Sequence, residues 1–159
     1  MRRAGLMLIA AALSASIAAC AADPFAGTWR LNVRKSKYIP GTCPRSMTIE
    51  MEVAGNGVRY ASETTQADGR MTRARYTASY DGTEAIVMAT AGLMAPVSLR
   101  RIDDRTVVAS YMRGMQVIAT SRQSVSKNGR LMTIVTVSPD QSGRSVTNIG
   151  VYERLPRPE

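Results

Sequence analysis

The sequence predicts an all-β fold, an antiparallel up-and-down meander that closes into a roughly 8- to 10-stranded β-barrel. Apolar and polar residues alternate with a period of two along most of the chain, as in half-buried strands. Turn signals recur about every 8 to 12 residues, a spacing typical of sandwiches and barrels. Beyond the N-terminus no segment has a helical repeat long enough to predict a helix.

The N-terminal segment "MRRAGLMLIAAALSASIAAC" has the three parts of a secretory signal. Arg2 and Arg3 precede an uncharged, mostly apolar run over 4–19, and small residues follow. This run is short for a transmembrane helix, which needs about 20 apolar residues. We therefore expect residues 1–19 to be a cleaved signal peptide.

The end of this segment, "IAAC", resembles the lipobox of bacterial lipoproteins. The resemblance implies cleavage before Cys20, lipid attachment to its sulfur, and, because Ala21 follows, an outer-membrane lipoprotein facing the periplasm. Several acyl chains anchor a protein stably where one does not. The alternative is ordinary cleavage near 19–21, which would release a soluble periplasmic or secreted protein. Acylation of Cys20 would leave Cys43 as a lone thiol, which we expect to be buried and inert.

Each strand is predicted from the alternation of apolar and polar residues along its own segment. In "GTWRLNV" Trp29 and Leu31 share one face, and in "MTIEMEV" the apolar residues alternate with Thr and Glu before the turn "GNG". The segment "MTRARYTASYDG" alternates Ala and Tyr against Arg, Thr and Ser, then ends in a tight Asp-Gly turn. The predicted strands are 27–33, 46–54, 57–65, 70–80, 83–89, 96–102, 105–112, 115–126, 130–138 and 144–154. Residues 20–26 are expected to be a short tether, 27–155 the barrel domain and 156–159 a tail.

A closed meander requires its first and last strands to pair, which would bring Arg154 close to the only tryptophan, Trp29. A guanidinium over an indole ring stabilises a fold by about 0.5 to 2 kcal/mol. The segment "FAGTWRL" resembles the G-x-W signature of the calycin superfamily, which includes lipocalins, and "GVYERL" resembles the last strand of fatty-acid-binding proteins. The resemblance implies a lipocalin-like barrel in which Gly27, Trp29 and Arg154 are structural.

Two departures from those families limit the ligand that we expect. The segment "RKSKYIPGTCP" has no helical pattern that could form a helical lid. Gly150 stands where fatty-acid-binding proteins have an Arg that grips the ligand carboxylate, so a neutral ligand is favoured. The expected cavity-lining residues are Tyr60, Tyr76, Tyr80, Ala119, Asn148 and Tyr152. A ligand-binding barrel should keep a cavity of roughly 300 Å³ or more.

Charge and residue content narrow the function further. The formal net charge is +9, but the Lys and Arg residues are scattered, whereas nucleic-acid sites cluster them, so we expect no nucleic-acid partner. The chain has no His, and neither a nucleophile with its base nor a standard metal site can be assembled from its residues. We therefore expect no enzyme, no metal and no cofactor. The favoured function is binding of a small apolar or amphipathic molecule. The alternative is a filled barrel that serves as a structural or interaction module of the cell envelope.

Overall fold

Antiparallel strands make up most of the computed structural model, which describes residues 22–39, 41–91, 95–140 and 142–156. The strands are β1 (Gly27–Leu31), β2 (Lys37–Ile39), β3 (Ser46–Ala54), β4 (Gly57–Thr65), β5 (Met71–Ser79), β6 (Asp81–Ala85), β7 (Met88–Ala89), β8 (Val97–Asp103), β9 (Thr106–Arg113), β10 (Gln116–Val125), β11 (Leu131–Pro139) and β12 (Ser145–Arg154). The predicted signal peptide and Cys20 lie outside the described residues.

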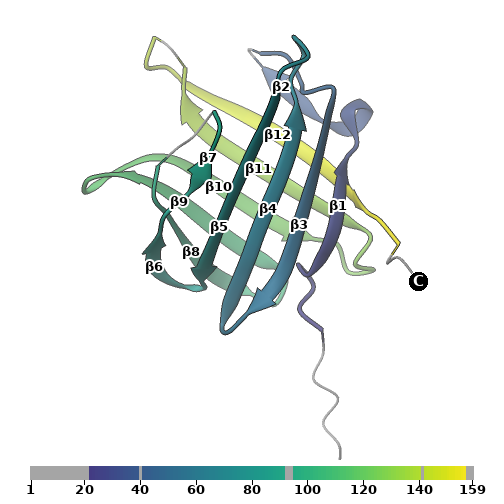
Figure 1. Ribbon diagram of the computed structural model, residues 1–159, viewed down its shortest axis with the longest axis vertical. Helices are drawn as coiled ribbons and strands as arrows, with labels where there is room; N and C mark the ends of the chain where they lie inside the picture. Colours follow the sequence, from purple (N-terminus) through teal and green to yellow (C-terminus); the bar gives the residue numbers. More distant parts are fainter. Residues whose placement is uncertain (1–21, 40, 92–94, 141, 157–159) are drawn as a thin grey trace, which may run out of the picture.

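The predicted all-β meander is confirmed. One 12-stranded sheet has the order β6-β8-β9-β10-β11-β12-β1-β3-β4-β5-β7, and β2 pairs separately with β12. Figure 1 shows this sheet curling so that the first and last long strands lie side by side. In the antiparallel pair β1–β12, Trp29 lies opposite Arg154. This register places the two predicted partners together.

A single segment that changes partners joins the two edges of the sheet. The strands at the edges, β6 and β7, are consecutive in the chain, and β6 pairs with β8 whereas β7 pairs with β5. A β-bulge in β6 and the positive φ of Gly82 (92°) turn the chain at the start of this segment. The backbone N–H of Arg101 also donates to the carbonyl of Tyr80 at 3.2 Å, linking β8 to the end of β5. The predicted strand 83–89 is therefore two short strands.

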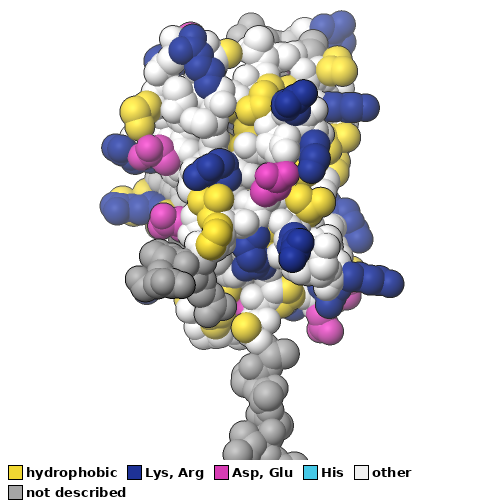
Figure 2. All heavy atoms as spheres, turned by 90° about the vertical axis from the view of Figure 1, so that its right-hand side faces the viewer, with side chains coloured by type: hydrophobic (Ala, Val, Ile, Leu, Met, Phe, Trp, Pro, Cys, Tyr) yellow, Lys and Arg dark blue, Asp and Glu magenta, His cyan; other side chains and the backbone are white. Residues whose placement is uncertain are grey.

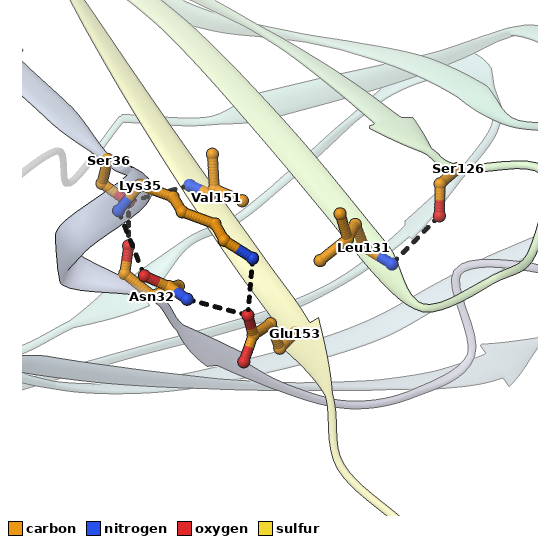
Figure 3. A network of polar contacts seen from close by, with 7 residues as sticks. All are labelled: Asn32, Lys35, Ser36, Ser126, Leu131, Val151 and Glu153. Atoms are coloured by element: carbon orange, nitrogen blue, oxygen red, sulfur yellow. Dashed lines mark hydrogen bonds and ion pairs between the residues drawn. The ribbon is translucent and has the colours of Figure 1, made fainter.

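The segment between β1 and β3 is more ordered than the sequence predicts. A 3-10 helix, η1 (Val33–Lys35), follows β1, and β2 then adds to the edge of β12. Asn32 ends the first strand early, because its Oδ1 accepts from the Lys35 backbone N–H at 3.1 Å. Asn32 Nδ2 and Lys35 Nζ both donate to Glu153 Oε1, at 2.7 and 3.1 Å (Figure 3). The Val151 N–H donates to Ser36 Oγ at 2.9 Å, so contacts with β12 hold this segment.

The hydrophobic core includes Phe25 of the segment through which the chain enters β1. The largest fully buried side chains are Phe25, Trp29, Ile49, Val97, Leu99, Val107 and Met132. We call the end that contains Phe25 and Trp29 the closed end, and the opposite end, with the β4–β5 and β9–β10 turns, the open end. Phe25 is 1 % exposed. Part of the expected tether 20–26 thus belongs to the barrel domain, because Phe25 packs into the core.

Among the described residues, no helix has the length and hydrophobicity of a membrane span.

Candidate functional site

The closed end is sealed by Trp29, Phe25 and Arg154. The Trp29 side chain is fully buried, and its Nε1–H donates to the Phe25 carbonyl at 2.9 Å. The Arg154 guanidinium carbon lies 4.1 Å from the centre of the indole ring. Arg154 also donates to the Pro24 carbonyl at 2.5 Å, to the Gly129 carbonyl at 2.6 Å and to the Ala26 carbonyl. These contacts hold the N-terminal segment across the end of the barrel, which is a structural role.

A second arginine holds the same segment from the opposite wall. Arg101 of β8 donates to Asp23 Oδ2 at 2.5 Å, and both side chains are mostly buried. Its guanidinium carbon lies 4.1 Å from the centre of the Tyr80 ring and 5.5 Å from that of Phe25. Burial raises the pKa of Tyr80 to about 12. The expected cavity-lining residue Tyr80 therefore belongs to the closed end and lies away from the cavity at the open end.

A cavity of about 200 Å³ lies at the open end of the barrel. It is lined by Met47, Tyr60, Ser62, Thr64, Gln66, Thr72, Arg73, Ala74, Tyr76, Val87, Ala91 and Tyr111. Most of these side chains come from the inward faces of β3, β4, β5 and β9. The expected lining residues Tyr60 and Tyr76 are thus brought together here, whereas Ala119, Asn148 and Tyr152 are not in the lining.

Aromatic rings form the inner wall of this cavity. Tyr60 and Tyr76 lie directly opposite each other on β4 and β5. Their ring centroids are 4.6 Å apart with an interplanar angle of 7°, which is a stacked pair. Tyr111 on β9 lies opposite Ala119 on β10, and this small partner leaves room for the phenol. The sequence signal for Tyr111 was its shared parity with Val107 and Ala109, both of which are buried.

The phenols of the cavity are uncharged at neutral pH. Burial raises the pKa of Tyr60, Tyr76 and Tyr111, and the neighbouring phenols raise it further for Tyr60 and Tyr76. Among the described residues of the lining, Arg73 alone is charged, and its exposed guanidinium pairs with Glu63 at 2.8 Å. The interior surface therefore combines aromatic rings with neutral hydroxyl and amide groups.

The expected residues Asn148 and Tyr152 both lie on β12. The Tyr152 hydroxyl donates to Met47 Sδ at 3.3 Å, and Tyr152 is buried, so it supports the lining residue Met47 from behind. Asn148 lies opposite Tyr38 of β2, and burial raises the pKa of Tyr38 as well. Five of the six tyrosines, all but Tyr80, thus line the cavity or lie on β2 and β12. Cys43 is a half-buried free thiol packed against the core, and burial raises its pKa.

Further hollows lie on the outside of the barrel. One of about 610 Å³ lies at the closed end, between the segment Ala22–Thr28, the turn at Asn128–Arg130 and Arg154–Pro156. Another, of about 390 Å³, lies over Ala61, Arg75 and Met88, and a third, of about 220 Å³, lies over Thr48, Glu50 and Glu63. Within the described residues, no group of three or more His, Cys, Asp or Glu side chains could hold a metal ion.

No known family model matches this chain, and no curated protein shows significant similarity to it.

Proposed function

We propose that this protein is a lipocalin-like carrier that binds a small, neutral, amphipathic molecule at the open end of its barrel and has no catalytic chemistry of its own. It acts in the cell envelope, where acyl chains on Cys20 hold it to the outer membrane on the periplasmic side. The observation that carries the proposal is the cavity of about 200 Å³ at the open end, lined by Tyr60, Tyr76 and Tyr111.

The division of the barrel into two halves supports this function. Trp29, Phe25 and Leu99 fill the closed half, whereas the open half keeps a cavity. Natural cores pack to high density, so a hollow on one side of a tightly filled core needs a reason. At about 200 Å³, the cavity is smaller than the roughly 300 Å³ that we expected of a ligand-binding barrel, and this difference counts toward the filled barrel. A ligand that fits inside this cavity is smaller than a fatty acid.

The first experiment is native mass spectrometry of the protein purified from the membrane fraction of its own host, before and after organic extraction. The expected result is a protein mass that starts at Cys20 with acyl chains, together with a further mass that extraction removes. A protein mass that starts beyond Cys20 without acyl chains would show that the lipoprotein interpretation is wrong. No extractable mass in repeated preparations would contradict the carrier function.

A matched pair of variants places the ligand in the barrel. Ala74 lines the cavity, and its cross-strand neighbour on β4 is Ser62. Ala74→Leu should fill the cavity and remove the extractable mass. Ala61→Leu is the control, because Ala61 is the preceding residue on β4 and faces outward beside Arg75. Loss of the bound mass in both variants would contradict a ligand held inside the barrel.

The alternative function, a filled interaction module, is favoured by apolar side chains on the outer surface. Ile39, Ile86 and Met115 are 71, 80 and 100 % exposed. Figure 2 shows hydrophobic side chains interspersed with many Lys and Arg residues and few acidic ones on one face of the barrel. Such a surface suits a protein partner or an anionic membrane. This function becomes the better one if no ligand is extracted.

A further inference from the structure

The open-end cavity has room for about one ring, and a longer ligand would extend out of its mouth. An apolar cavity of about 150 Å³ in another protein binds benzene. The cavity here is somewhat larger, about 200 Å³, and so has room for one ring with one or two small substituents. A long alkyl chain would have to leave the cavity and cross the polar side chains of Gln66 and Thr72, which lie at the ends of β4 and β5.

The walls of the cavity favour an aromatic ring over an aliphatic one. The rings of Tyr60 and Tyr76 are stacked, and Tyr111 lines the same space from β9. Aromatic rings attract one another in offset-stacked and edge-to-face arrangements, because the face of a ring is negative and its edge positive. Met47 adds a thioether, which also makes favourable contacts with aromatic rings.

The electrostatics of the cavity favour a neutral ligand with one polar group. A carboxylate would lose its hydration against uncharged phenols, because the guanidinium of Arg73 is exposed and already paired with Glu63. Ser62 and Thr64 of β4 present hydroxyl groups in the lining, and these can donate to or accept from a ligand hydroxyl. One polar substituent on a ring can therefore be satisfied inside the cavity.

We infer that the open-end cavity lined by Tyr60, Tyr76 and Tyr111 binds a neutral, single-ring phenol or aryl alcohol. This inference rests on the proposed carrier function and makes its ligand class specific. The ring packs against the three tyrosines, and its hydroxyl lies toward Ser62 and Thr64. Aromatic content of the walls, rather than apolar area alone, then selects the ligand.

Isothermal titration calorimetry with four probes on the mature protein, after organic extraction has removed any bound ligand, tests this inference. The probes are p-cresol, its saturated counterpart 4-methylcyclohexanol, the anion 4-methylbenzoate and the longer n-decanol. We expect p-cresol to bind at least about tenfold more tightly than each of the other three. Ala74→Leu should abolish p-cresol binding, whereas Ala61→Leu should leave it unchanged.

A second variant tests the contribution of one aromatic wall, and tryptophan fluorescence tests whether each variant is folded. Tyr111→Leu removes one aromatic wall but keeps apolar bulk, so it should weaken p-cresol binding about tenfold and leave 4-methylcyclohexanol binding unchanged. The fluorescence of Trp29 at the closed end reports whether each variant is folded.

The outcomes distinguish the ligand class from the carrier function. Binding of n-decanol or 4-methylcyclohexanol as tight as that of p-cresol would overturn the aromatic class and leave a carrier. Binding of p-cresol that survives Ala74→Leu in a folded variant would overturn the assignment to this pocket. If none of the four probes binds and no mass is extracted from the native protein, both the class and the carrier function are wrong.

Discussion

Replacing Arg154 with methionine should destabilise the barrel more than replacement of any exposed arginine on its wall. The methionine side chain keeps part of the aliphatic packing but removes the guanidinium. The carbonyls of Pro24, Ala26 and Gly129 then lose a charged donor, and the Trp29 ring loses its cation. The variant therefore measures how much the polar and cation–π contacts of Arg154 contribute to stability at the closed end.

The structure sets the expected magnitude. Hydrogen bonds from a charged donor contribute about 1.5 kcal/mol each at the low end, which applies because Arg154 is half-buried. Three such bonds and a cation–π contact of about 0.5 kcal/mol give about 5 kcal/mol. Water reaches the freed carbonyls and recovers part of this, so the free energy of unfolding should fall by about 3 kcal/mol. Typical domains have only about 5 to 15 kcal/mol in total.

Urea unfolding followed by Trp29 fluorescence measures this loss, because the chain has one tryptophan and it lies under Arg154. Arg75→Met on the exposed face of β5 is the control, with an expected change within about 0.5 kcal/mol. Arg154→Lys should show an intermediate loss, since an ammonium cannot reproduce the planar fork of donors. A loss below about 1 kcal/mol for Arg154→Met, at an unchanged urea m-value, would refute the structural role of this residue.

Three further predictions concern packing and ionisation. Phe25→Ala should lower the free energy of unfolding by about 3 to 5 kcal/mol, because Phe25 is fully buried, and a drop below about 1 kcal/mol in urea would show that 22–26 is a tether after all. Gly57→Ala should lower the melting temperature well below that of Gly41→Ala. The new Cβ at position 57 would lie 1.9 Å from the Ala78 carbonyl oxygen, whereas a Cβ at Gly41 would have nothing within 4 Å. Equal melting temperatures of the two variants would contradict this. Stability should begin to fall near pH 9, where the unfolded Cys43 thiol ionises before the folded one, and should fall more steeply above about pH 10. Each protected phenol then contributes up to about 1.4 kcal/mol per pH unit, because the unfolded phenols ionise there while Tyr80 keeps its proton to about pH 12. Urea titrations at several pH values test this, and a flat profile up to about pH 12 would count against it.

The faces of the strands could be predicted from the sequence, because a period of two fixes which residues share a side. Trp29 and Arg154 followed from that parity together with the pairing of the first and last strands, and the register confirms both. The alternation shows which face of a strand a residue is on, but not how far along the barrel axis the residue lies. Tyr76 and Tyr80 share a face, yet one lies in the cavity and the other under Arg101 at the closed end.

The strand β2 could not be predicted, because little in its own three residues specifies it. Its pairing with β12 and the hydrogen bond from Val151 to Ser36 hold it in place, and both depend on residues more than a hundred positions away. The break between β6 and β7 was missed for a related reason. The change of pairing partner from β8 to β5 depends on where the two edges of the sheet meet in space.

The pairing of β1 with β12 has a consequence for how the protein is made. Arg154 and its partner Ala26 lie 128 positions apart in sequence. Most inner strands, by contrast, pair with the next strand along the chain and can form hairpins as synthesis proceeds. Until β12 leaves the ribosome, β1 and β11 each present an unpaired edge, and such edges promote association between chains. A message truncated before the codons of the last strand would therefore yield a chain prone to aggregation, even though nearly all of its core residues had been translated.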